Sequence, residues 1–205
     1  MLSRKNSIYG LLLVAGLLLI RFNPVAAQNA TKTFLADAKV WKGPGDTIRN
    51  MLIYINQYNC QFNISLTDTI TGTTTLYSPK DIQGFSYIIQ DETVEYTSMP
   101  NPTDLGKIFL RVLYRGTYTL YQFLEINYNT PALSFDVYYF LWKDEWINPP
   151  LTQKFERESL LSHFSDCPEL EYKIKTGEYG LSKIRNIMTE YEDCKLTDEY
   201  EFFFE

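Results

Sequence analysis

The sequence has few of the residues that metal sites and nucleophilic catalysis need. Its 205 residues include one histidine, His163, and only three cysteines. Zinc takes three or four nitrogen, sulfur or carboxylate ligands, and a histidine-dependent nucleophile needs a serine or cysteine partner at recognisable spacing. No P-loop, dinucleotide-binding glycine motif or EF-hand loop is present. The sequence therefore predicts a protein without cofactor, metal or catalytic residues, in which His163 is a surface or capping side chain.

Long apolar runs are absent, apart from one near the N-terminus. Ile8 to Ile20 is apolar but shorter than the roughly 20 residues of a comfortable membrane span. Basic residues precede this run and small residues lead up to Ala27, a pattern typical of a signal peptide. We therefore predict a signal peptide over residues 1–27, cleaved between Ala27 and Gln28, and export to the periplasm, the cell envelope or the outside. An uncleaved membrane anchor is the alternative, because Arg21 directly after the run is atypical of a signal peptide.

Positive charge is scarce, and the formal net charge of the whole chain is −6. The predicted signal peptide contains three of the 19 basic residues and none of the 25 acidic ones, so the chain that follows it would carry −9. An acidic chain is a poor match for nucleic acid or an anionic lipid surface. We expect no nucleic-acid partner; the sequence does not identify the partner and leaves an envelope protein or a glycan as candidates. The aromatic content of 16% favours an ordered, sheet-rich body.

Apolar and polar residues alternate with a period of two over much of the chain, which indicates strands. The clearest example is Lys107 to Leu124, where Gly116 supplies the backbone freedom that a hairpin reversal needs. Similar alternation predicts strands over Lys32–Trp41, Cys60–Thr67 and Leu133–Trp142. These segments place a strongly apolar face on one side of a sheet.

The period changes in the last quarter of the chain. Asn148-Pro149-Pro150 is expected to end the strands, because proline cannot donate to a ladder. Helical spacing follows over Phe155–Phe164 and, most clearly, over Leu181–Tyr191. Asp166 with Glu169 three residues later predicts the capped start of a further helix.

Strands that precede helices in this order predict an α+β fold. We expect an N-terminal antiparallel β-sheet or partly rolled barrel followed by two to three C-terminal helices. Residues 28–205 suit a single exported domain. Residues 28–142 would be mainly strands and residues 155–192 mainly helices, and residues 193–205 would form an acidic tail, either docked or a last strand.

Export makes disulfides possible. Cys167 and Cys194 bracket a helical segment and are the preferred pair, which leaves Cys60 free or buried. Closing a loop of that size stabilises by about 3 kcal/mol in the chain-entropy model. Three buried thiols are the alternative.

Several short segments carry a resemblance to a group of known proteins. Tyr77 to Phe85 (YSPKDIQGF), Gly45 to Ile48, Phe109 to Leu113 and Ser165 to Pro168 are the segments concerned. Together they resemble small exported proteins of Bacteroidetes-type bacteria that have no assigned activity. The resemblance implies an exported sheet-plus-helix protein and no catalytic residue. The chain departs from that pattern in its long acidic C-terminus and in lacking a second glycine after Ile48.

Aromatic side chains are the best candidates for a ligand site. Tyr138, Trp142 and Trp146 could form a platform for a sugar or a peptide, although cross-strand packing is the common use of aromatic residues in strands. The carboxylate pairs Asp91-Glu92 and Asp144-Glu145 fall where turns are expected, which predicts solvated charge.

The leading prediction is a non-catalytic binding or structural component of the cell envelope. A carboxylate-based, glycosidase-like hydrolase is one alternative, because a glycosidase needs only two suitably spaced carboxyl groups. A small outer-membrane β-barrel is another, since the length allows eight strands.

Overall fold

The computed structural model describes residues 34–104, 106–129, 133–152 and 156–201. The predicted signal peptide and its cleavage site between Ala27 and Gln28 lie outside the described residues. Within the described part of the chain, no helix combines the length and the apolar character that crossing a membrane takes.

All ten described strands belong to one antiparallel sheet, in the order β10-β9-β8-β7-β6-β5-β1-β2-β3-β4. Because β10 and β4 lie at its two edges, the sheet is open. The strands are β1 (Phe34–Gly43), β2 (Asp46–Ile55), β3 (Ile64–Asp68), β4 (Thr74–Tyr77), β5 (Gly84–Ile89), β6 (Glu92–Pro100), β7 (Lys107–Arg115), β8 (Thr119–Asn127), β9 (Ser134–Lys143) and β10 (Glu145–Thr152).

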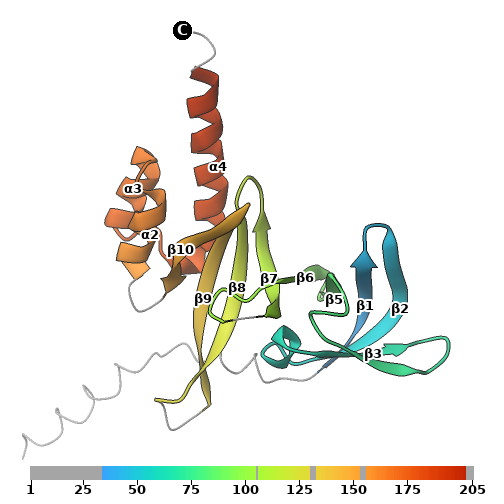
Figure 1. The fold of residues 1–205 in the computed structure, drawn as a ribbon. Helices are drawn as coiled ribbons and strands as arrows, with labels where there is room; N and C mark the ends of the chain where they lie inside the picture. Colours follow the sequence, from blue (N-terminus) through green and yellow to red (C-terminus); the bar gives the residue numbers. More distant parts are fainter. Residues whose placement is uncertain (1–33, 105, 130–132, 153–155, 202–205) are drawn as a thin grey trace, which may run out of the picture.

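Helices follow the strands, so the predicted α+β class is confirmed, with an open sheet rather than a closed barrel. Figure 1 shows the helices gathered beside β7 to β10, while β1 to β3 curl away at the other end of the sheet. The helices are α2 (Glu156–Phe164), α3 (Pro168–Lys175) and α4 (Ile184–Glu201), with the 3₁₀ turns η1 (Asn59–Gln61) and η3 (Leu181–Lys183).

The helices and the two ends of the sheet enclose separate apolar cores. One core is formed by β1, β2, β3, β5 and β6 and includes Cys60 of η1. The other lies between the helices and one face of β8 to β10, where Leu120 and Leu141 meet Phe164 and Ile187. Burial of such side chains contributes about 25 cal/mol per Å² of apolar area removed from water, so each end of the sheet has its own stabilising layer.

Strand β7 joins these two ends. Residues 107–112 of β7 pair with β6, and residues 111–115 pair with β8. Only Arg111 and Val112 pair on both sides, so the sheet diverges on either side of this short junction.

Gln61 fills the place that β7 leaves empty beside β8. Its side-chain amide donates to the backbone carbonyl of Leu124 at 2.9 Å and accepts from the backbone N–H of the same residue at 2.6 Å. Gln61 is only 1% exposed. A buried backbone group without a partner is costly, so this amide does for Leu124 what a neighbouring strand would have done.

Helix α4 is tied to the turn of the β7–β8 hairpin. The Glu192 carboxylate accepts the backbone N–H of Tyr118 at 3.0 Å. A side chain at Gly116 would collide with that carboxylate, since an added Cβ would lie 2.5 Å from Glu192 Oε1. Gly116 does not have a left-handed backbone, so the close approach of α4, rather than the reversal itself, explains the glycine.

Two predictions about strands are wrong. The segment that begins at Cys60 starts with η1, and the strand begins only at Ile64, because Gln61 is needed as a clamp on β8. Asn148-Pro149-Pro150 does not end the strands, since β10 runs through it to Thr152. Proline is tolerated there because β10 is an edge strand and its register with β9 is broken between Ile147 and Leu151.

Two predictions about helix ends also need correction. Asp166 does not cap α3, because the N-cap position is Cys167. The Asp166 carboxylate instead accepts from the Tyr191 hydroxyl at 3.2 Å and pairs with Lys195 at 2.7 Å, which fastens it to α4. The predicted acidic tail is not a strand up to Glu201, because α4 continues to that residue.

The three cysteines adopt the predicted pairing. Cys167 and Cys194 are bonded, with their Cα atoms 6.3 Å apart, and link the start of α3 to α4. Cys60 is a buried free thiol. Burial raises the pKa of the Cys60 thiol to about 11, against a smaller opposing effect of a backbone hydrogen bond from Asn56.

Replacing Gln61 by leucine tests the clamp. The Gln61→Leu variant leaves both backbone groups of Leu124 unpaired in the core, so the free energy of unfolding should fall by about 3 kcal/mol. Urea unfolding followed by tryptophan fluorescence measures this, with Gln83→Leu as the control, because the Gln83 side chain is exposed. Equal losses in the two variants would contradict the role given to Gln61.

Alkylation tests the disulfide. With the Cys167–Cys194 bond intact, urea-unfolded protein treated with iodoacetamide without reductant should gain a single label, on Cys60. The bond closes a segment with a sequence separation of 27 residues, so the Cys167→Ser/Cys194→Ser double variant should lose about 3.5 kcal/mol of unfolding free energy in the chain-entropy model. Three labels on the unreduced protein would show that the Cys167–Cys194 bond is absent.

The buried thiol predicts a pH dependence. The pKa of Cys60 is raised from 9.0 to about 11 in the folded protein. The stability that the protonated thiol contributes is therefore fully present below pH 9 and is lost as pH rises toward 11. Between pH 7 and pH 10 the native protein should therefore lose about 1.4 kcal/mol more than Cys60→Ala does. Urea unfolding at a series of pH values measures the difference, and parallel curves for the two proteins would show that Cys60 does not titrate as described.

Candidate functional site

The three aromatic residues singled out in the sequence lie on one face of the sheet, the face opposite the helices. Trp142 of β9 and Trp146 of β10 are direct cross-strand partners, and their ring centroids are 4.8 Å apart. Tyr138 lies four residues before Trp142 on β9, so its side chain points to the same side of the sheet. All three side chains are half-buried.

A layer of buried aromatic rings supports them. We call the whole set the aromatic face. The Trp146 ring reaches across β9 to β8, with centroid distances of 5.8 Å to Phe140 and 5.7 Å to Tyr121. The aromatic face consists of Tyr121, Phe123, Tyr138, Phe140, Trp142 and Trp146.

The rings of the aromatic face do not form one flat platform. Trp142 and Trp146 are nearly perpendicular, at 81°, and Trp146 also meets Tyr121 and Phe140 edge to face. Such pairs contribute about 0.5–1.5 kcal/mol beyond area burial. Packing therefore accounts for the inner rings, and the half-exposed Trp142 and Tyr138 remain available to a ligand.

Polar groups border the aromatic face at both ends. Thr119 lies directly across from Trp142 on β8. Burial and then a hydrogen bond to Glu125 raise the pKa of the Tyr138 hydroxyl, so it stays protonated at neutral pH. Glu125 and Tyr138 lie at the end away from Thr119. Arg115, the cross-strand partner of Thr119 on β7, forms an ion pair with Glu95. Sequence alone did not single out Thr119 or Glu125, because finding them takes the register of β8 against β9.

One buried donor in the aromatic face has no acceptor. Within the described part of the chain, the indole Nε1–H of Trp146 is shielded from solvent and makes no hydrogen bond. An unpaired buried donor costs about 1–3 kcal/mol. Such a cost is typical of positions where function rather than stability sets the choice of residue.

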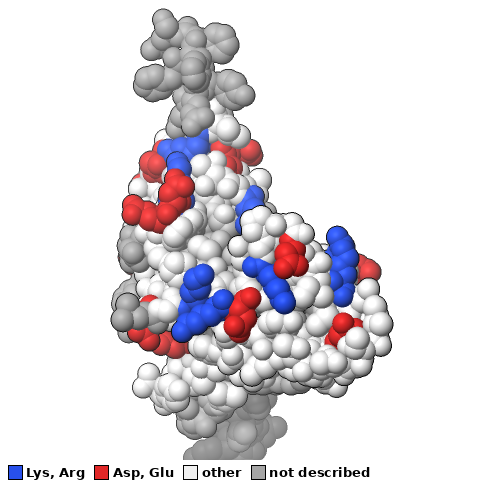
Figure 2. Space-filling view, turned by 45° about the vertical axis from the view of Figure 1, so that its right-hand side comes forward, with Lys and Arg blue, Asp and Glu red and all other residues white. Residues whose placement is uncertain are grey.

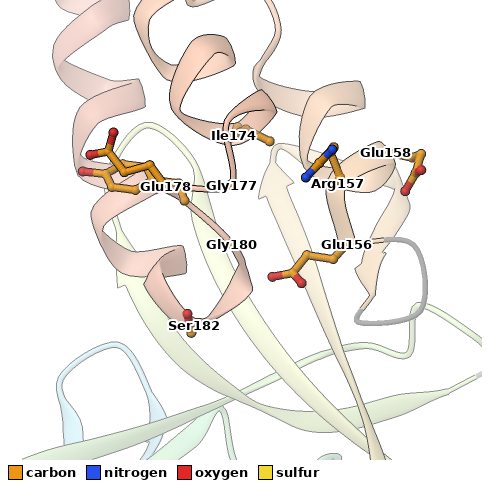
Figure 3. A pocket seen from close by; sticks show the side chains of 9 residues that line it. Glu156, Arg157, Glu158, Ile174, Gly177, Glu178, Gly180 and Ser182 are labelled. Carbon is orange, nitrogen blue, oxygen red and sulfur yellow. The ribbon is translucent and has the colours of Figure 1, made fainter.

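A hollow of about 580 Å³ lies between α2 and the loop that leads to η3. Three glutamates line it, but Figure 3 shows the Glu158 and Glu178 carboxylates on opposite sides of the hollow, with that of Glu156 below and between them. The Glu156 carboxylate accepts the backbone N–H of Leu181 and so fixes the start of η3. These carboxylates do not converge on one point, and Glu156 has a structural role.

A second hollow, of about 550 Å³, lies beside the disulfide. There the Lys173 ammonium is held 2.9 Å from Glu190 and 3.1 Å from Glu169, and hydrogen bonds to these carboxylates raise its pKa. The Tyr179 hydroxyl also donates to Glu190. This network joins α3 to α4 and needs no ligand to explain it.

The other candidates for chemistry lie apart from one another. Asp91 and Asp144 have φ values of 64° in the β5–β6 and β9–β10 turns, as expected for solvated turn residues. His163 is half-buried on α2, with its ring 6.2 Å from that of Phe164. Among the described residues, no group of three or more His, Cys, Asp or Glu side chains is placed to hold a metal ion.

No family model, no curated protein and no solved structure matches the chain. The resemblance to small exported proteins of Bacteroidetes-type bacteria therefore stays a prediction.

Proposed function

We propose that the chain is an exported, non-catalytic binding component of the cell envelope and that its aromatic face holds a neutral glycan. The observation that carries the proposal is the Trp146 indole N–H, which has no acceptor among the described residues although its ring lies beside the half-exposed Trp142. A sugar hydroxyl that reached this group after a small ring movement would supply the missing acceptor.

The chemistry of the aromatic face favours a glycan over a peptide. Small-molecule sites combine apolar, aromatic surface with a few placed polar groups. Here the rings offer flat apolar area for the C–H faces of a sugar, while Glu125 and Thr119 offer hydrogen-bond partners for its hydroxyls. A bound peptide would instead need backbone partners, and the inner strands β8 and β9 already pair on both sides.

The charge of the chain favours a neutral ligand. The formal net charge is −6, which disfavours acidic polysaccharides at long range. Figure 2 shows Lys and Arg beside Asp and Glu in small mixed groups, with uncharged surface between them, over the described part of that view. Export itself rests on the sequence pattern of residues 1–27.

Replacing Trp142 by alanine tests the glycan site. Trp142 is the suitable position because it is half-buried and contacts one other ring, whereas Trp146 packs against three. The chain from Gln28 to Glu205 would be screened on an array of neutral oligosaccharides, and the best ligand measured by calorimetry. Trp142→Ala should weaken binding at least tenfold, through loss of one stacking surface.

The control is Tyr172→Ala, which removes an aromatic ring that is 66% exposed on α3 and should leave binding unchanged. Mass spectrometry of the ligand after incubation tests the absence of catalysis. Cleavage of the glycan would favour the hydrolase alternative. The glycan site would be refuted if no glycan on the array bound, or if Trp142→Ala and Tyr172→Ala lost the same amount of binding affinity.

A further inference from the structure

A polar row crosses the helix-facing side of the sheet, opposite the aromatic face. Arg111 of β7 is the direct cross-strand partner of Tyr96 on β6 and of Gln122 on β8, and Gln122 is the partner of Tyr139 on β9. Direct partners point to the same side of a sheet. Arg111, Gln122 and Tyr139, which we call the polar row, are all half-buried.

The polar row separates apolar layers. On β8, Leu120 belongs to the core beneath the helices, and Leu124 belongs to the cluster next to Tyr58 and Phe135. Gln122 lies between these two leucines on the same face. A row of polar side chains with apolar neighbours on both sides needs its own explanation, because burial of unpaired polar groups is unfavourable.

Arg111 carries a charge that no described carboxylate balances. Its hydrogen bond to a described side chain is long, from Nη1 to Gln122 Oε1 at 3.4 Å, and its other side-chain neighbours include the neutral tyrosines Tyr96 and Tyr139. Arg115, four residues along β7, has a side chain that is 52% exposed and nevertheless pairs with Glu95. The more buried arginine is thus the one without an ion pair, although desolvated charges are normally paired.

The neighbours of Arg111 form a chain of donors. Gln122 accepts from Arg111 through its oxygen and hydrogen-bonds Tyr139. Burial is the main cause of the raised pKa of the Tyr139 hydroxyl, which Arg111 and Gln122 partly oppose, so that hydroxyl stays protonated at neutral pH and can donate. A guanidinium presents five N–H donors in a planar fork that matches carboxylate or phosphate oxygens.

We propose that Arg111, with Tyr139 and Gln122, binds the oxyanion of a small ligand, a carboxylate or a phosphate. The bound oxyanion supplies the counter-charge that Arg111 lacks. The guanidinium fork donates to two oxygens of the oxyanion, and the Tyr139 hydroxyl donates a further hydrogen bond to one of the oxyanion's oxygens. This site is on the other side of the sheet from the aromatic face and stands whether or not that face binds a glycan.

The test measures anion binding at Arg111 directly. The chain from Gln28 to Glu205, labelled with ¹⁵N, would be titrated separately with sodium acetate and with inorganic phosphate at constant ionic strength, set with sodium chloride. The arginine Nε–Hε signal of Arg111, assigned by its loss in Arg111→Met, should shift and saturate with at least one of the two anions. The arm that saturates at the lower concentration identifies the oxyanion.

Variants separate this site from general ionic effects. The unfolding temperature of the native protein should rise as the binding anion is added. Arg111→Met should need at least tenfold more of that anion for the same rise, whereas Arg115→Met should show the rise of the native protein. An Arg111 signal that does not shift with either anion overturns the proposal. So does a stabilisation that Arg111→Met retains. If Arg111→Met does not fold, Arg111→Lys, which keeps the positive charge and removes the Nε–Hε group, assigns the signal, and the titration of the native protein then decides.

Discussion

The fold depends on one buried side-chain amide. Gln61 satisfies both backbone groups of Leu124 at the position where β7 has already left β8. Without it, the divergence of β7 would leave a donor and an acceptor of a central strand unpaired in the core, at a cost of about 1–3 kcal/mol each. The amide thus permits a ten-stranded sheet to part into two directions while its backbone stays satisfied.

The parting of the sheet determines which surfaces are covered. The strands β1, β2, β3, β5 and β6 enclose a core of their own, so the helices are needed only at the other end, where they cover one face of β7 to β10. None of the described helices packs against the opposite face of β8 to β10, which is shielded mainly by its own aromatic rings, above all by Trp146. A surface closed by large rings, rather than by a second layer, retains half-exposed apolar area, and this is the area that the glycan proposal uses.

Local patterns predicted those parts of the fold that local physics determines. The hairpin from Lys107 to Leu124, the helical stripe from Leu181 and the Cys167–Cys194 pair all follow from spacing along the chain. The course of β10 through two prolines did not, because proline is acceptable only on an edge strand, and edge position is a property of the whole sheet. Of the candidate site, Tyr138, Trp142 and Trp146 were found by composition, but their perpendicular packing and the unpaired indole N–H depend on long-range register.

The polar row shows the same limit and links the two ends of the molecule. Alternation along β7 places Arg111 on the mixed face, between Phe109 and Leu113, and a charge between two apolar residues was the one sequence signal available. Arg111 is also one of the two residues at which β7 pairs with both β6 and β8. An oxyanion bound there would therefore brace the junction itself, since it would hold the side chain of the residue on which both directions of the sheet meet. Among the described residues, the charge without an ion pair thus lies at the junction of the two directions of the sheet.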